Sequence, residues 1–239
     1  DPGSVIQASD VFVLPNKETY FDLVMLEVLS LGQIVVASYT GGNKYFAKYN
    51  KLKRTYEAGT RLIAEIKDEI MYLESIINAI DIATTENDLN NIKDELAVTG
   101  YIKRSGKSKS KGNTHNKPMH YVSSDGFDIY VGKNNIQNDE LTFKFATGGD
   151  WWFHAKQMPG SHVIVKTEGK ELPDKTFEEA AALAAYYSKG RDLEKVEVDY
   201  VLKKEVKKPA GAKPGFVVYY TNYSLIAIAD ISGIRLISG

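Results

Sequence analysis

Residues 125–165 read DGFDIYVGKNNIQNDELTFKFATGGDWWFHAKQMPGSHVIV, and this stretch decides the fold of the second half of the chain. It holds both tryptophans and two of the four histidines. Asp125-Gly126 predicts a hairpin turn, because glycine adopts a positive φ without steric cost. Apolar-rich runs at 119–122 and 127–131 flank this turn as two predicted strands, and the polar loop 132–135 follows them.

A short helix is expected after this loop. Asn138 is a suitable N-cap, because its side-chain oxygen accepts hydrogen bonds from the free N–H groups of a first turn. The acidic residues 139–140 suit the positive end of the helix dipole. Leu141 and Phe145 give the helix a buried side, and Gly148-Gly149 predicts its end.

Two further strands are expected at residues 151–155 and 162–166, separated by a turn at Pro159-Gly160. They present His154 and His162. Side chains alternate along a strand, so one of the two tryptophans points into the core and the other points away. The sequence leaves open which of the two is buried.

The remaining residues continue the same domain. Thr176-x-x-Glu179 predicts the capping box of another helix. Residues 196–202 alternate apolar and charged side chains, which predicts a half-exposed strand. The runs 216–220 and 224–228 predict a hairpin. This order of elements predicts an α+β fold over residues 119–239, with helices on one side of a sheet.

Residues 45–102 carry a different period. Thr84 or Thr85, with Asp88, caps a return helix that stops at Gly100. Before it, apolar residues recur at alternating spacings of four and three, which is the heptad pattern of a coiled coil. This seam consists of Tyr45, Tyr49, Leu52, Tyr56, Gly59, Ile63, Ile66, Ile70, Leu73, Ile77 and Ile80. The segment is therefore predicted to be a coiled-coil helical hairpin.

The return helix is too short to cover the whole seam. One hypothesis is that the seam pairs with a second copy of the chain and forms a homodimer. The alternative is that residues 1–43 cover it. The sequence does not decide between these two arrangements.

A basic linker is expected at residues 103–118. Within it, residues 103–117 read KRSGKSKSKGNTHNK, with six Lys or Arg residues and neither an acid nor an apolar side chain. Such a segment has nothing to bury and is predicted to be flexible. Its cations also suit contact with phosphate, with an affinity that falls as salt rises.

Composition narrows the function. The chain has 239 residues and a net charge of −1, so any binding to nucleic acid requires a local basic patch. The lack of cysteine excludes disulfides and thiolate metal sites. We find neither a run of membrane-spanning length nor a signal peptide, so a cytoplasmic location without membrane contact is expected.

Residues 1–44 predict a small β-α-β, Rossmann-like fragment, with strands at 11–15 and 34–37 and a helix at 23–31. This fragment resembles part of the donor-sugar half of retaining GT-B glycosyltransferases. Glu27 matches the second of two glutamates typical of that family, but Thr19 stands at the place of the first. Too few strands are present for the whole fold. A remnant of a sugar-nucleotide enzyme stays an alternative function, and catalysis is not expected.

The second half of the chain resembles the C-terminal domain of the NFACT family. The matching motifs lie at residues 130–139, 150–156, 159–163, 178–187 and 207–215. This family includes bacterial proteins named fibronectin-binding protein A, which are regarded as RqcH-type ribosome quality-control factors. The resemblance is strong over about half the chain and, with the helical segment, extends over about four-fifths.

The resemblance implies an RNA-binding module that contacts tRNA or rRNA on stalled large ribosomal subunits. It would position tRNA rather than make or break bonds, so no cofactor is expected. The family's N-terminal domain and its helix-hairpin-helix segment are not found in this sequence. Binding is therefore expected without synthesis of alanine tails. A surface adhesin that binds fibronectin is the alternative that the older family name suggests.

Two loops are the best candidates for RNA contact. Loops 132–135 and 207–215 carry lysines, amides or exposed backbone N–H groups, which suit phosphates and sugars. The aromatic side chains near residue 152 suit stacking on an unpaired base. The predicted RNA-binding residues are Lys133, Asn134, Asn135, Asn138, Trp152, His154, Lys156, His162, Lys207, Lys208 and Lys213.

Two other chemistries fit the residues less well. His154 and His162 are possible metal ligands, but no carboxylate stands close in sequence to complete a set. The acids at 139–140 with Lys144 resemble a nuclease group, but they suit helix capping better. We therefore predict neither a metal site nor catalytic residues.

Overall fold

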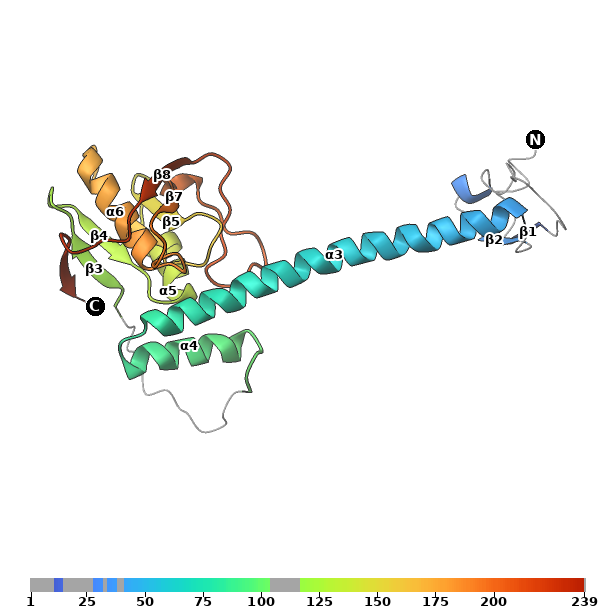
Figure 1. Cartoon of the computed structure of the whole chain (residues 1–239), viewed down its shortest axis with the longest axis horizontal. Coiled ribbons are helices and arrows are strands. Elements are labelled where there is room, and N and C mark those ends of the chain that lie inside the picture. The colour runs from blue at the N-terminus through green and yellow to red at the C-terminus, as the bar shows by residue number, and fades with distance from the viewer. Residues whose placement is uncertain (1–10, 15–27, 32–33, 38–40, 104–116, 239) are drawn as a thin grey trace. The chain divides into compact units, whose positions relative to one another are not determined.

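The computed structural model describes residues 11–14, 28–31, 34–37, 41–103 and 117–238. The chain divides into two compact units, Asp1–Lys67 and Asp68–Gly239, which we take one at a time (Figure 1). The helix α3 (Gly41–Ile82) contributes residues to both units.

In the first unit, β1 (Val11–Leu14) and β2 (Ile34–Ala37) form a parallel pair. Both strands were predicted, and both have side chains open to solvent, since Val13 is 59% exposed and Ile34 is 63% exposed. Parallel sheets are usually covered on both faces by other elements. The exposed side chains of this short pair differ from that usual arrangement. Of the expected helix, residues 28–30 are helical. Thr19 and Glu27 lie outside the described residues, so the likeness to glycosyltransferases stays untested.

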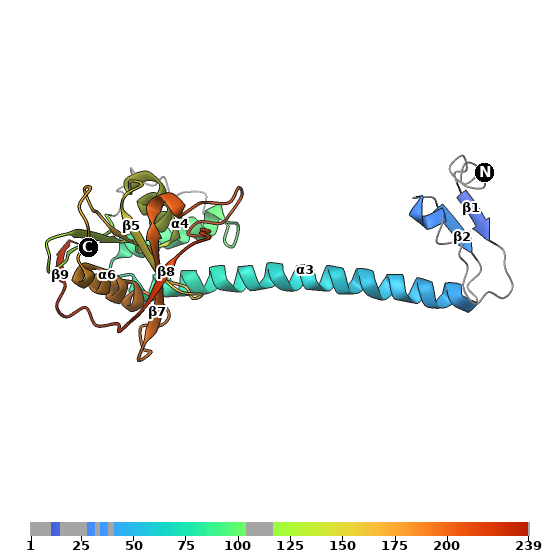
Figure 2. The same cartoon turned by 90° about the horizontal axis from the view of Figure 1, so that it is seen from above.

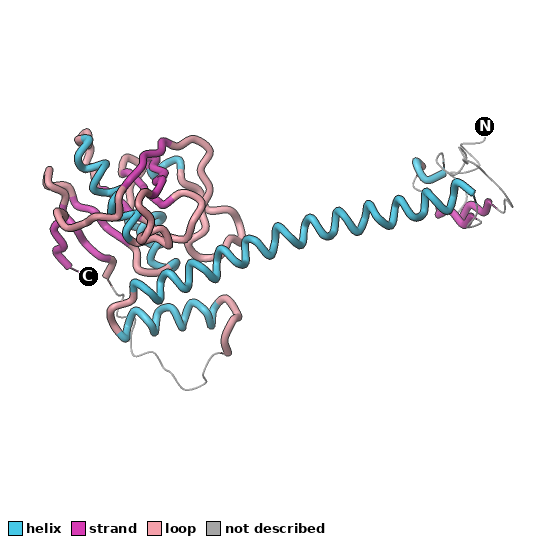
Figure 3. Tube along the Cα trace, viewed as in Figure 1, coloured by secondary structure: helices cyan, strands magenta, loops and turns pink. Residues whose placement is uncertain are grey.

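In the second unit, α4 (Glu86–Val98) folds back along the end of α3 (Figure 3). Thr85 is the N-cap of α4 and accepts a hydrogen bond from the Asp88 backbone N–H, while the Asp88 side chain accepts one from the Thr85 N–H. The predicted capping box and helical hairpin are therefore confirmed. The basic linker falls mostly on residues 104–116, which lie outside the described residues.

The face that α3 buries differs from the predicted seam. Tyr72, Ile76 and Ala79 pack against α4, whereas the seam residues Leu73 and Ile77 remain exposed. The buried stripe also has spacings of four and three, but it lies one position before the seam. Two apolar stripes thus run side by side on this helix, and heptad spacing alone does not tell which one is covered. Pairing of the seam as a coiled coil stays a prediction.

The rest of the second unit is built on a seven-stranded antiparallel sheet in the order β8-β7-β5-β6-β4-β3-β9. Figure 2 labels four of these strands, β5, β7, β8 and β9. Its strands are β3 (Met119–Val122), β4 (Asp128–Val131), β5 (Trp151–Ala155), β6 (Val163–Val165), β7 (Val196–Leu202), β8 (Tyr223–Ala227) and β9 (Arg235–Ser238). The predicted α+β class is confirmed, and β9 was missed.

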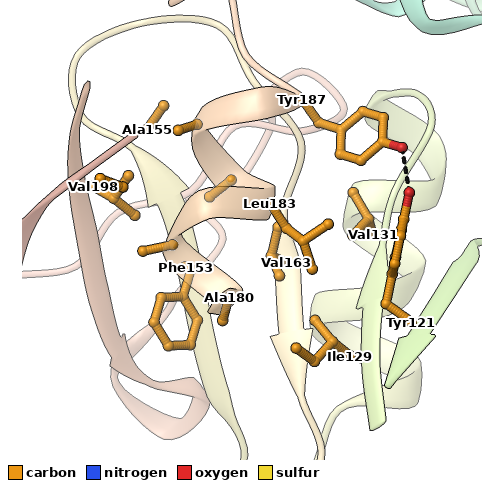
Figure 4. Packing of buried hydrophobic residues seen from close by; sticks show 14 of the residues in the cluster. Tyr121, Ile129, Val131, Phe153, Ala155, Val163, Ala180, Leu183, Tyr187 and Val198 are labelled. Carbon is orange, nitrogen blue, oxygen red and sulfur yellow. Dashed lines mark hydrogen bonds between the residues drawn. The ribbon is translucent and has the colours of Figure 1, made fainter. Parts of the chain in front are cut away.

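The two faces of the sheet are covered by different elements. α6 (Asp174–Tyr186) lies on one face, where Leu183 packs with Phe153 and Val163 (Figure 4). The hydroxyl groups of Tyr121 and Tyr187 lie 2.6 Å apart in the same core. On the other face, Trp152 packs in a cluster with Leu141. The prediction that helices lie on one side was therefore wrong. In β7, Asp199 and Val201 are buried while Glu197 is exposed, so the side of the strand that was predicted to be open is only partly open.

The helix after loop 132–135 begins earlier than expected. α5 (Asn135–Glu140) continues into a π-helical turn, η1 (Leu141–Phe145), and its N-cap is Asn134 rather than Asn138. The Asn134 side chain accepts from the Gln137 N–H at 2.9 Å. Asn138 instead accepts from the His162 backbone N–H at 3.0 Å and so ties α5 to the start of β6. Several asparagines in a row offer several possible caps, and tertiary contacts select one.

The predicted capping box at Thr176 and Glu179 was also wrong, because α6 already begins at Asp174. Thr176 donates to the Asp125 carboxylate at 2.8 Å, and Glu179 accepts from the Ser124 N–H at 2.8 Å. Both side chains therefore hold the β3–β4 turn against α6. The sequence pattern is that of a cap, but the two residues serve a tertiary contact.

The last predicted hairpin does not form. β8 pairs with β7, and Val218 forms an isolated bridge with Lys207 instead of pairing with β8. The turn between β5 and β6 also lies earlier than Pro159-Gly160, with Gln157 at φ 53°. A short apolar run does not specify its partner strand, so these pairings depended on the assembled sheet.

Candidate RNA-binding surface

The loop 132–135 is buried at the contact between the helical hairpin and the sheet. The Lys133 side chain is 3% exposed, and its Nζ lies 3.5 Å from Asp88 Oδ1 of α4. Asn135 donates to Glu95 Oε1 at 2.9 Å and to Ser75 Oγ at 2.8 Å. We call this set the hairpin joint. It uses the lysine and the amide that the sequence suggested for phosphate contact.

Glu95 is the acidic centre of the hairpin joint. Its Oε1 accepts from Tyr72 at 3.0 Å as well as from Asn135, whereas Oε2 has no hydrogen-bond partner among the described residues. Burial raises the pKa of Glu95, and these two hydrogen bonds oppose that rise. Burial also acts to raise the pKa of Asp88, but the Thr85 hydrogen bond and the charge of Lys133 hold it below its usual value.

The second predicted loop, 207–215, is fixed by two of its lysines. Lys208 forms an ion pair with Asp139 and donates to the Lys213 carbonyl at 3.1 Å. Lys213 donates to the Tyr101 hydroxyl at 2.9 Å, and its Nζ lies 4.5 Å from the centre of the Tyr72 ring. The loop is thereby held against α5 and the helical hairpin, which brings the two predicted loops together.

Lys207 differs from its neighbours in this loop. Its backbone pairs with Val218 in both directions at 2.9 Å, and its side chain is exposed. The loop therefore fixes the position of a cation that remains free to contact a ligand. Lys156, by contrast, is half-buried and pairs with Glu197 at 2.5 Å.

The two histidines lie beside Trp152, with His162 buried and His154 half-buried. Trp152 is fully buried, and its ring centre lies 5.1 Å from that of His162 and 5.5 Å from that of His154. Burial lowers the pKa of His162 well below its usual value, and the neighbouring His154 lowers it further. Trp151 is the more exposed tryptophan, but it packs against Phe177 of α6.

The surroundings of His162 are those of a packed histidine. Nowhere in the described ranges do three His, Asp or Glu side chains gather in the way a metal ion requires. His162 Nδ1 lies 2.8 Å from the Thr142 hydroxyl. This nitrogen is therefore engaged in a hydrogen bond within the protein.

A pocket of about 560 Å³ lies between the β3–β4–β9 edge of the sheet and the α5–η1 helix. Its lining includes Lys117, His120, Tyr130, Glu140, Lys144 and Phe145. Lys117 belongs to the predicted basic linker, whose cations suit contact with phosphate, and the other residues were not among the predicted RNA contacts. In the structure β3 pairs with β4 so that His120 lies opposite Tyr130, a register that the sequence did not specify. The predicted start of the following helix was also too late, so the side of α5 that faces these rings was not considered.

Comparisons with known sequences support a family assignment. Residues 117–221 match the profile of the NFACT protein RNA binding domain, and residues 41–115 match that of the NFACT N-terminal and middle domains. Together the two matches cover the helical segment and most of the sheet, including both predicted loops. No helix in the described part of the chain is long and apolar enough to cross a membrane.

Several curated proteins are similar to the chain. The Rqc2 homolog RqcH of Streptococcus suis is 46% identical over 177 residues, which is 74% of this chain and 31% of that protein. The Rqc2 homolog RqcH of Bacillus subtilis is 38% identical over 188 residues, which is 78% of this chain and 32% of that protein. The chain thus spans about a third of the length of these relatives.

One solved structure is also similar. It is the C-terminal part of the fibronectin/fibrinogen-binding protein from Streptococcus suis, with a TM-score of 0.72 and 43% identity. The alignment covers 80% of this chain and 76% of that one. Sequence and fold therefore agree, and the chain belongs to the NFACT family, whose relatives include ribosome quality-control factors of the RqcH type.

Proposed function

We propose that this chain is the RNA- and ribosome-binding part of a ribosome quality-control factor, and that it contacts tRNA or rRNA on stalled large subunits in the cytoplasm. The observation that carries this proposal is the match of residues 117–221 to the NFACT RNA binding domain, together with RqcH relatives at 38–46% identity. The chain covers about a third of the length of those relatives. An activity of the full-length relatives is therefore assigned to this chain only as a proposal.

In this proposal the predicted residues have two roles. The buried members Lys133, Asn134, Asn135, Asn138, Trp152 and His162 hold the hairpin joint and the core in place. Contact with phosphate falls to cations at the surface, of which Lys207 is the clearest example. RNA would be positioned by charge and shape, without a bond-making step by the protein.

The test is RNA binding by the whole chain across a salt series. Lys207→Glu is compared with Lys195→Glu, which reverses the same charge at another exposed position. We expect the first variant to bind labelled tRNA several-fold more weakly at low salt, with a salt slope reduced by about one, and the second to match the parent. Failure of the parent to bind any RNA at low salt would contradict the proposal.

Binding of fibronectin is the second candidate function. It rests on the similarity, at 43% identity, to the C-terminal part of the fibronectin/fibrinogen-binding protein from Streptococcus suis. A pull-down with immobilised fibronectin, using the same protein preparation as the RNA assay, distinguishes the two functions. Saturable binding that RNA does not displace would favour an adhesin.

A further inference from the structure

We propose that the pocket between the β3–β4 strands and the α5–η1 helix binds an unpaired nucleobase of single-stranded RNA. This inference rests on the proposed RNA-binding function and names the class of RNA that the domain would prefer. The pocket volume of about 560 Å³ lies within the usual range for small-molecule sites.

The first reason is that the pocket presents aromatic rings that are already held in place. The rings of His120 and Tyr130 are stacked, with centroids 4.5 Å apart and an angle of 8° between their planes. Phe145 meets Tyr130 edge-on at 4.7 Å, and Lys166 Nζ lies 5.0 Å from the Phe145 centroid. Phe145 nevertheless remains 44% exposed. A fixed ring with an open surface is what an unstacked base requires for stacking.

The second reason is the charge around the pocket. Lys117 and Lys144 line it, and the Lys144 side chain is 76% exposed. Lys144 pairs with Glu140 at 3.2 Å, and exposed pairs of this spacing are weak, so the lysine can turn to a phosphate at little cost. Asp128, the other acid near the rings, is engaged with His120 at 2.7 Å. The lysines therefore favour a nucleotide within a strand, which has a phosphate on its 5′ side and another on its 3′ side.

The arrangement favours single-stranded RNA over duplex. In a duplex the bases are stacked on one another, and their faces are closed to protein side chains. Phosphate contacts alone would bind both forms, whereas stacking in the pocket requires an unpaired base. The proposal therefore predicts a difference between the two RNAs that depends on Phe145.

The experiment measures the affinity of the whole chain for a fluorescent 12-nucleotide single strand and for a 12-base-pair duplex. Phe145→Ala should weaken binding of the single strand about tenfold and leave the duplex unchanged, because stacking on one side chain is lost. Its control is Leu193→Ala, which removes an exposed apolar side chain elsewhere. Lys144→Glu should weaken binding more than Lys175→Glu, which disrupts a similar exposed pair on α6.

A photo-crosslink keeps the test decisive if Phe145→Ala affects folding. A strand that contains 4-thiouridine should crosslink the parent protein within residues 117–145. Crosslinks elsewhere, together with an unchanged affinity of Phe145→Ala, would overturn the pocket and leave RNA binding intact. Equal weakening for both RNAs would overturn it as well. If the chain binds no RNA at all, both the proposed function and the proposed pocket fail.

Discussion

Gly132 lies where the side chain of Asn138 needs its space. A Cβ atom at this position would be 2.1 Å from Asn138 Oδ1 and 3.1 Å from the Asn138 backbone nitrogen. The backbone atom cannot move without shifting α5. The absence of a side chain at residue 132 therefore allows Asn138 to reach the His162 N–H.

Gly132→Ala is expected to destabilise the fold by about 1–3 kcal/mol, the usual cost of overpacking. Urea unfolding followed by tryptophan fluorescence measures this change. Gly233→Ala is the matched control, because its added Cβ would have no neighbour within 4 Å. Equal effects of the two substitutions would show that the contact with Asn138 is unimportant.

The residues of the hairpin joint show where sequence reasoning stops. A lysine and two amides in a polar loop look the same whether they face a phosphate or a buried carboxylate. The sequence predicted the loop and its polar character correctly. Its partners Asp88 and Glu95 lie 40 or more residues earlier in the chain, so only the assembled fold reveals them.

At the scale of the elements, Glu95 couples α3 and α4 to the sheet domain. Its raised pKa means that the native state holds the Glu95 proton more tightly than the unfolded chain does. The resulting stabilisation is fully present below the unfolded pKa of about 4.3 and is lost as the pH rises through the folded pKa. Deprotonation thus weakens the hairpin joint.

Glu95→Gln removes this titration and keeps an acceptor for Tyr72 and Asn135. We expect the variant to be more stable than the parent at pH 7, with a difference that grows from about pH 4.5 upward and then becomes constant. Denaturant unfolding at several pH values measures it. The difference isolates Glu95, because every other ionisable group is the same in the two proteins. A difference that does not change with pH would contradict the raised pKa.

The exposed seam of α3 belongs to the same scale. Seam residues such as Ile63, Ile70 and Ile77 are about half exposed, which is consistent with the homodimer hypothesis. If the seam pairs two copies, multi-angle light scattering at high concentration should give a dimer, and Ile63→Lys with Ile70→Lys should give a monomer. A parent protein that is monomeric under these conditions would contradict the hypothesis.

Elements were easier to predict than their contacts. The α4 capping box and the strands β3 to β7 follow from local signals, namely Thr85 with Asp88 and alternating apolar residues. The pairing of 216–220 and the position of α5 depended on contacts made across the sheet. Heptad spacing likewise identified α3 as a helix but not the face that it buries.

At the scale of the whole molecule, the second unit presents a fixed surface rather than a catalytic centre in our proposal. Lys208 and Lys213 hold the loop 207–215 against α5 and the helical hairpin, which leaves Lys207 and the pocket near Phe145 as the points of contact with RNA. The chain belongs to the NFACT family and has the sheet fold described above, and the ribosome as its partner is our proposal.

The most direct test of this account is co-sedimentation of the chain with purified large ribosomal subunits, with and without peptidyl-tRNA, across a salt series. We predict binding that prefers the subunit carrying peptidyl-tRNA and that weakens as salt rises. Lys195→Glu should bind as the parent does, and Lys207→Glu should bind less. Failure to sediment with either subunit at low salt would contradict the account.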